Sequence, residues 1–283
     1  MRFGTTTMRR QAGGVLVAIA AVLWASDSMA GDLNGFLREK GHGDAALSYT
    51  LEGYEEFWVG DTKVKDPGVG NVSTRSLSLW AAYGLTDRFT VIADIPLVDT
   101  RGDGLGQFEE RDLQDLTLLV AGRIASVGDR VRSEFIGAFG VRSDPFGYEA
   151  NLPVDVGDGT DDWLFRLVYQ LRFRNFYFSQ QVGYDLRDDD APDGLPFYTE
   201  VGQTWGPVTA TGFYSKYIAN GGTDIGDPGF TFPSNGDEFT RIGAKVYGRV
   251  MDHFGLAGAW FGTLRGRNTG DTSGFSGGVV VSF

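Results

Sequence analysis

The chain has 283 residues, a formal net charge of −12, no cysteine, 42 glycines and an aromatic content of 13%. The lack of cysteine excludes disulfides, a lipid-modified N-terminal cysteine and thiolate metal sites. The acidic balance argues against nucleic-acid binding, which requires patches of lysine and arginine, and the aromatic content argues against disorder.

The first 30 residues are expected to be a cleavable signal peptide. Three arginines within the first ten residues precede an apolar run at 13–25, and Ser28-Met29-Ala30 supplies small residues for a cleavage site. The run is shorter than the ~20 residues that a membrane-spanning helix requires, which favours cleavage over anchoring. Residues 31–44 are polar and rich in glycine, and we predict that they form a periplasmic lead-in.

Alternation of apolar and polar residues predicts strands through the remaining chain, 45–283. A period of two places successive side chains on opposite faces of a strand. The clearest case is a hairpin at 163–186, where WLFRLVYQLRF and FYFSQQVGYDL flank Arg174-Asn175. In chain order, the pattern predicts strands near 46–56, 73–83, 89–97, 113–124, 135–141, 163–173, 176–186, 197–205, 208–217, 241–250, 254–264 and 275–283.

The connections between these twelve predicted strands alternate between short and long. This order puts five short turns at one end of the sheet with both termini, and six longer loops at the other. A sandwich with Greek-key connections has no reason to alternate in this way. An outer-membrane barrel has short periplasmic turns, long outer loops and an even number of strands. We therefore predict an all-β fold, a 12-stranded antiparallel transmembrane barrel in the outer membrane of a Gram-negative bacterium.

Aromatic residues occur at both ends of the predicted lipid-facing surface. Side chains that are apolar at one end and polar at the other favour the two membrane interfaces. The predicted girdle residues are Tyr83, Phe89, Trp163, Phe173, Phe176, Tyr184, Phe254 and Phe283. The alternation that ends at Phe283 also resembles the closing strand by which the barrel-assembly machinery recognises its substrates. The expected partners are this machinery, outer-membrane lipid and an unidentified small solute.

Charged side chains of both signs are predicted on the inward face of the barrel. They are Glu52, Glu56, Asp94, Asp115, Glu134, Arg166, Arg172, Asp185, Glu200, Arg241, Lys245, Arg249 and Arg265. Such charges require partners of opposite sign across the lumen, or water. The interior is therefore either a polar conduit whose field selects solutes, or an interior closed by salt bridges and too narrow to conduct.

Aromatic side chains are predicted to share this inward face. They are Trp80, Tyr177, Tyr198, Phe213, Tyr217 and Phe261. One interpretation is an aromatic-lined path for apolar solutes, and the other is packing that narrows the lumen. The sequence leaves both open.

The loops contain clusters of aspartate, but no catalytic constellation is recognisable. The clusters are Asp155, Asp158, Asp161 and Asp162, followed by Asp188, Asp189 and Asp190. Close carboxylates can bind Ca²⁺ or Mg²⁺, but this spacing does not match a calcium-binding loop, so we expect solvated charge and no metal or other cofactor. The two histidines, His42 and His253, fall at the predicted periplasmic end, and without a base beside a nucleophile we predict no enzymatic activity.

Several segments resemble outer-membrane proteins associated with the meta-pathway of phenol degradation. The resemblance rests on YGLTDRFTVIADIPLV at 83–98, DLQDLTL at 112–118, Leu152-Pro153 and Gly157-Asp158-Gly159. The Gly-Gly-Asp-like approach to the fourth strand is replaced by Leu113-Gln114 before Asp115. The resemblance implies a barrel that moves small organic molecules, often aromatic ones. We therefore expect a channel or transporter for small solutes, with a structural or adhesive barrel of occluded lumen as the alternative.

Overall fold

The computed structural model of the chain describes residues 32–65, 68, 70–104, 108–150, 156–188, 191–228 and 230–283. The expected signal peptide lies outside these residues. So do Leu152-Pro153 and three of the predicted loop aspartates, Asp155, Asp189 and Asp190.

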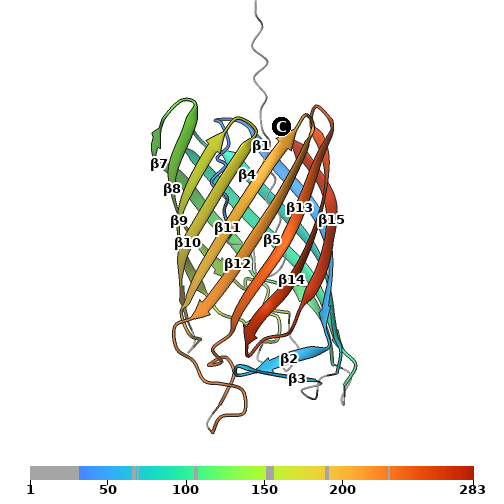
Figure 1. Cartoon of the computed structure of the whole chain (residues 1–283). Helices are drawn as coiled ribbons and strands as arrows, with labels where there is room; N and C mark the ends of the chain where they lie inside the picture. The colour runs from blue at the N-terminus through green and yellow to red at the C-terminus, as the bar shows by residue number, and fades with distance from the viewer. Residues whose placement is uncertain are drawn as a thin grey trace, which may run out of the picture.

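Twelve antiparallel strands close into a barrel, as the alternation predicts (Figure 1). They are β1 (Gly43–Tyr54), β4 (Val72–Gly84), β5 (Phe89–Gly102), β7 (Leu116–Val127), β8 (Val131–Ser143), β9 (Asp162–Phe173), β10 (Phe176–Arg187), β11 (Gly194–Trp205), β12 (Val208–Ala219), β13 (Glu238–Met251), β14 (Phe254–Arg267) and β15 (Ser273–Ser282). Each strand pairs with the next along the chain, and β1 closes the ring by pairing with both β4 and β15. Within the described residues, no helix is long and apolar enough to cross a bilayer.

The short turns and the long loops lie at opposite ends of the barrel, as predicted. The C-terminus lies at the short-turn end, and the long loops project from the other end (Figure 1). Two long loops contain strands that the sequence did not indicate. A separate hairpin, β2 (Glu56–Val59) and β3 (Thr62–Lys65), occupies the first loop, and β6 (Phe108–Leu113) pairs with the end of β5 in the second. All three are too short to show a recognisable alternation.

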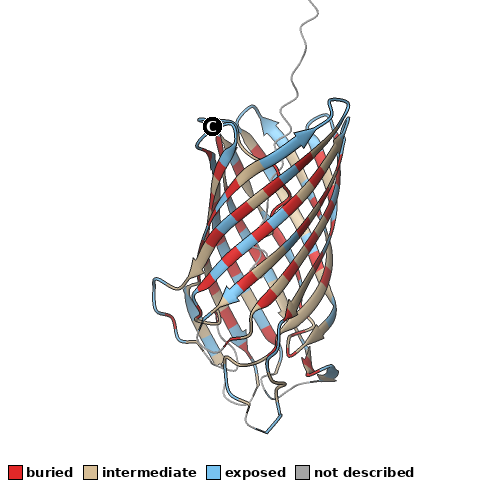
Figure 2. Ribbon diagram, turned by 90° about the vertical axis from the view of Figure 1, so that its left-hand side faces the viewer, coloured by how far each residue is buried: buried red, intermediate tan, exposed pale blue. Residues whose placement is uncertain are grey.

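The outside of the barrel is a belt of apolar side chains. Buried and exposed residues alternate along the strands (Figure 2), and the exposed positions are predominantly leucine, valine, phenylalanine and other large apolar residues. Burying apolar surface contributes roughly 25 cal/mol per Å², so this belt favours lipid over water. Trp163 and Tyr184 lie toward the long-loop end. The other six predicted girdle residues lie toward the short-turn end, where the rings of Tyr83 and Phe283 stack at 6.4 Å.

The described part of the predicted lead-in, residues 32–40, enters the interior of the barrel. Leu33 is buried in an apolar cluster, most of whose members come from the short-turn halves of their strands. The wall residues of this cluster are Ala46, Trp80, Ala82, Ile92, Leu119, Ala121, Ile136, Ala138, Leu164, Val168 and Val280. The interior is therefore divided along its axis into an apolar part near the short turns and a polar part near the long loops.

Candidate functional site: the lumen and its outer cavity

Most of the predicted lumen charges lie inside the barrel. Eight of them are at most 8% exposed, and Glu52 and Arg172 are half-buried. The eight are Asp94, Asp115, Glu134, Arg166, Asp185, Glu200, Arg241 and Lys245.

The buried charges in the middle of the lumen are paired. Arg166 on β9 pairs with Asp185 on β10, and Lys245 Nζ lies 3.2 Å from a carboxylate oxygen of Glu200. Closer to the short turns, the Glu134 carboxylate lies 2.7 Å from Arg123 Nε and 3.0 Å from an Arg132 nitrogen, and it also pairs with Arg172. A buried charge is tolerated only with such partners, so these groups hold the wall together.

Three predicted lumen charges lie elsewhere. Glu56 belongs to β2, outside the barrel, where it pairs with Lys63 at 2.8 Å, and the hydrogen bond from Lys63 lowers the pKa of its carboxyl. Arg249 is exposed near the short-turn end of β13. Arg265 faces outward because Leu264 is an extra residue in β14, so that Thr240 pairs with Arg265 but Arg241 pairs with Thr263. An inserted residue of this kind reverses the side of every later residue in the strand.

The expectation of solvated charge is wrong for two of the loop aspartates. Arg142 Nε donates to Asp162 at 2.9 Å, and Arg187 pairs with both Asp158 and Asp162. Burial opposes ionisation of Asp158, but the charges of Arg187 and Arg142 outweigh it and lower the pKa of this carboxyl. Asp161 and Asp188 are exposed. Within the described residues, no group of three or more His, Asp or Glu is arranged to hold a metal ion.

Five of the six predicted inward aromatic residues are packed into the interior. Trp80 joins the apolar cluster, Tyr177 packs edge-on against Phe36 at 4.9 Å, and a second cluster contains Tyr198, Phe213 and Phe261. Tyr217 differs, because it lines a cavity together with Phe239, whose ring stacks on it at 5.9 Å. The packing interpretation therefore describes most of this set.

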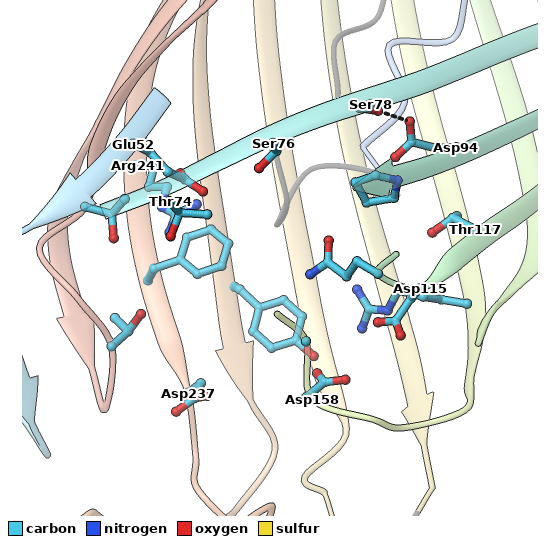
Figure 3. Close-up of a pocket in the computed structure, with 18 of the residues that line it drawn as sticks. Glu52, Thr74, Ser76, Ser78, Asp94, Asp115, Thr117, Asp158, Asp237 and Arg241 are labelled. Carbon is cyan, nitrogen blue, oxygen red and sulfur yellow. Dashed lines mark hydrogen bonds between the residues drawn. The ribbon is translucent and has the colours of Figure 1, made fainter. Parts of the chain in front are cut away.

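A cavity of about 300 Å³ lies in the polar part of the lumen, toward the long loops (Figure 3). Its charged lining consists of five carboxylates, Glu52, Asp94, Asp115, Asp158 and Asp237, and three guanidinium groups, Arg142, Arg187 and Arg241. Hydroxyl groups from Thr74, Ser76, Ser78, Thr117, Thr269 and Thr272 complete much of the surface. Ser78 donates to Asp94 at 2.6 Å and Tyr148 donates to Asp115 at 2.7 Å, so two of the carboxylates are held in place.

Three buried polar atoms of the cavity lining have no hydrogen-bond partner in the part of the chain that the structure describes. They are Thr117 Oγ1, the Tyr217 hydroxyl and Asp237 Oδ1. A buried polar group without a partner costs about 1–3 kcal/mol. Such groups are expected where water or a solute occupies the space beside them.

Residues 32–40 are attached to the barrel wall by individual hydrogen bonds. The Leu33 N–H donates to Gln181 Oε1 at 2.6 Å, and Gln170 Nε2 donates to the Asn34 carbonyl at 2.6 Å. Asn34 Nδ2 also donates to Glu200 at 3.1 Å. These contacts join the segment to the ion-paired layer of the lumen.

Comparisons with known proteins bear on the fold. No protein-family model matches the chain, and no curated protein sequence matches it. An outer membrane channel from Pseudomonas putida F1 is similar in structure, with a TM-score of 0.72 and 12% sequence identity over 89% of this chain and 98% of that chain. This chain has the fold of an outer-membrane β-barrel. The fold and the apolar belt place it in the outer membrane of a Gram-negative bacterium.

Other solved barrels are less similar. The translocator domain of the autotransporter NalP from Neisseria meningitidis has a TM-score of 0.49 and 11% identity, over 85% of this chain and 88% of that chain. A FadL homologue from Pseudomonas aeruginosa has a TM-score of 0.38 and 9% identity, over 86% and 90%. These likenesses concern architecture alone. The association with the meta-pathway proteins and the lack of enzymatic activity stay predictions.

Proposed function

We propose that this barrel is a channel for small solutes, with residues 32–40 as its inner closure. The cavity with its three unpartnered polar atoms carries the proposal. A barrel with a purely structural role would gain nothing from burying such groups, each of which costs about 1–3 kcal/mol. In a channel, passing solutes and water supply the missing hydrogen bonds.

The proposed route runs from the long loops to the short turns. A solute enters the outer cavity, moves past the Arg166–Asp185 and Glu200–Lys245 pairs, and leaves when residues 32–40 withdraw. A net hydrogen bond contributes about 0.5–1.5 kcal/mol, so releasing the segment costs far less than opening the strand pairing of the wall. The closure can therefore move while the barrel stays intact.

The class of solute follows from the resemblance and from the lining. The resemblance implies small organic molecules. Because five of the six inward aromatic residues are packed away and the cavity is lined by charges and hydroxyls, we propose small polar organic solutes in preference to apolar ones.

Two further assignments belong to this proposal. Residues 1–30 are removed on export, which the mass of the mature protein tests. The terminal strand β15 is the segment that the barrel-assembly machinery binds, and Phe283, 54% exposed beside Tyr83, is its anchor.

An occluded structural barrel is the second candidate function. The ion-paired middle of the lumen and the apolar cluster around Leu33 favour it, because both fill space that an open pore would leave to water. It differs from the channel in one consequence, since removing residues 32–40 would not create a path.

Conductance in planar lipid bilayers distinguishes the two candidates. The measurement compares the mature protein with a variant lacking residues 32–40, and a heat-induced shift in gel mobility verifies that both barrels are folded. We expect rare, small openings from the intact protein and frequent, larger ones from the variant. Two folded barrels without any conductance would refute the channel and establish the occluded barrel.

A further inference from the structure

We infer that the outer cavity is a binding site for small organic amines carrying positive charge at both ends. The inference rests on the proposed channel function and names the class of solute that the channel selects. It follows from the balance of charge, from the placement of the carboxylates and from the unpartnered atoms of the lining.

The cavity has more carboxylates than guanidinium groups to neutralise them. Arg187 is engaged by Asp158, and Arg142 is engaged by Asp162. When these two neutral pairs are set aside, the described lining retains four carboxylates (Glu52, Asp94, Asp115 and Asp237) and one guanidinium group, that of Arg241. Charges in a space with low-dielectric walls interact strongly with a solute, so the lining attracts cations and repels anions.

The carboxylates lie on two sides of the cavity. Asp94 is on β5 and Asp115 immediately precedes β7, whereas Asp237 immediately precedes β13. In the ring of strands, β13 is separated from β5 by β14, β15, β1 and β4, which places it nearly opposite. Figure 3 shows Asp94 and Asp115 on one side of the cavity and Asp237 away from them. A solute with one positive charge at each end matches this placement.

The unpartnered atoms accept the hydrogen bonds that an ammonium group donates. An ammonium has three N–H donors and no acceptor. Thr117 is 2% exposed and pairs across the strands with Asp94, so its Oγ1 lies beside one carboxylate group. On the opposite side are the other two unpartnered atoms, Asp237 Oδ1 and the Tyr217 hydroxyl. The stacked rings of Tyr217 and Phe239 add a π surface that favours a cation.

The volume limits the size of the amine. A water molecule in the liquid occupies about 30 Å³, so a cavity of about 300 Å³ holds a solute of up to roughly ten non-hydrogen atoms. Linear diamines of four or five carbons satisfy this limit, and their two ammonium groups are far enough apart to reach both sides.

Three probes of one length but different charge test the inference. They are 1,4-diaminobutane, 1,4-butanediol and succinate, and their entry into proteoliposomes is measured for the intact protein and for the variant lacking residues 32–40. We expect the diamine to enter fastest, the diol more slowly and succinate slowest. We also expect the diamine, and not succinate, to bind the detergent-solubilised protein in calorimetry.

Neutralisation of the acidic wall supplies the matched variants. Asp94→Asn combined with Asp115→Asn keeps both side-chain shapes, and we expect it to reduce the preference for diamine over succinate by about tenfold. Asp161→Asn, which removes an exposed loop carboxylate outside the cavity lining, should leave the preference unchanged.

The outcomes separate this inference from the proposed function. Entry of all three probes at similar rates, or fastest entry of succinate, refutes the selection of amines and leaves the channel intact. If no probe enters even without residues 32–40, the channel is refuted, and diamine binding in calorimetry then decides the amine site on its own. Absence of binding refutes the site.

Discussion

Glu200 accounts for how this lumen keeps a charge away from water. It is 2% exposed and accepts hydrogen bonds from Asn34, Tyr177 and Tyr198 besides pairing with Lys245. These partners come from β10, β11, β13 and the N-terminal segment, so one carboxylate connects the wall to the closure.

We expect Glu200→Gln to destabilise the barrel by about 3–5 kcal/mol, because it leaves the buried ammonium of Lys245 without its counter-charge. Urea unfolding monitored by tryptophan fluorescence measures the loss. Glu39→Gln is the control, since Glu39 is exposed. An unchanged unfolding midpoint for Glu200→Gln would contradict this account of the pair.

Asp237 gives the cavity a dependence on pH. Burial raises the pKa of its carboxyl to about 7, and the charge of Asp158 adds to the effect, while Asn235, Arg187 and Arg267 oppose it. The carboxyl is therefore largely protonated at pH 6 and largely ionised at pH 8. Because the unfolded chain loses this proton at a lower pH, the residue contributes progressively less stability as the pH rises from about 4 to about 7.

Cation binding has the opposite dependence, because the ionised carboxylate attracts the ammonium. We expect the affinity for 1,4-diaminobutane to rise between pH 6 and pH 8 in the intact protein, and to rise less in Asp237→Asn. Calorimetry at several pH values measures both. A steeper rise in the variant than in the intact protein would exclude Asp237 from the site.

At the scale of elements, residues 32–40 are the part of the chain that has a choice of position. Gly35 has a φ of +81°, and a Cβ added there would lie 3.1 Å from Ile136, 3.2 Å from Val168 and 3.3 Å from Gln170. We expect Gly35→Ala to push the segment off the wall and to increase conductance severalfold, with little change in the unfolding of the barrel.

Gly41→Ala is the matched control for this substitution. Gly41 has a φ of +80°, so an alanine has a similar backbone cost, but a Cβ there meets nothing within 4 Å. If both variants conduct equally, backbone strain and not the contact of Gly35 with the wall explains the effect, and the closure model loses its support.

The strands were predictable because burial against lipid leaves a strict period of two in the sequence. The departures have local causes that the alternation does not reveal. Leu264-Arg265 continues an apparently regular pattern, yet the extra residue turns Arg265 outward. Glu56 follows β1 closely enough to extend its alternation, but the chain turns into a separate hairpin.

The site was predictable in part. The period of two identifies which side chains point inward, as it did for Asp94 and Asp115, but not which of them meet across the lumen. Arg142 pairs with Asp162 and Arg187 with Asp158 because distant segments approach one another at the mouth of the barrel. Leu33 and Phe36 are apolar residues in a polar segment, which is the one sign in the sequence that the lead-in has a buried position.

The whole molecule combines a fixed wall with an interior of two kinds. The part near the long loops is polar and contains the cavity, and the part near the short turns is apolar and holds residues 32–40. Such a division predicts that solutes reach the cavity from outside more easily than they leave it toward the periplasm. The rate of passage then depends on the position of the segment, and selectivity depends on the cavity.

Reversible attachment of residues 32–40 to the wall tests this account most directly. The chain has no cysteine, and a Cβ at Gly35 would lie 3.3 Å from Gln170 Cβ, close to the separation of about 3.5–4.5 Å in a disulfide. In Gly35→Cys combined with Gln170→Cys, single-channel recordings are made before and after addition of a reducing agent. The account predicts a closed barrel while the disulfide is intact and frequent openings once it is reduced. Equal conductance in the two states would contradict it.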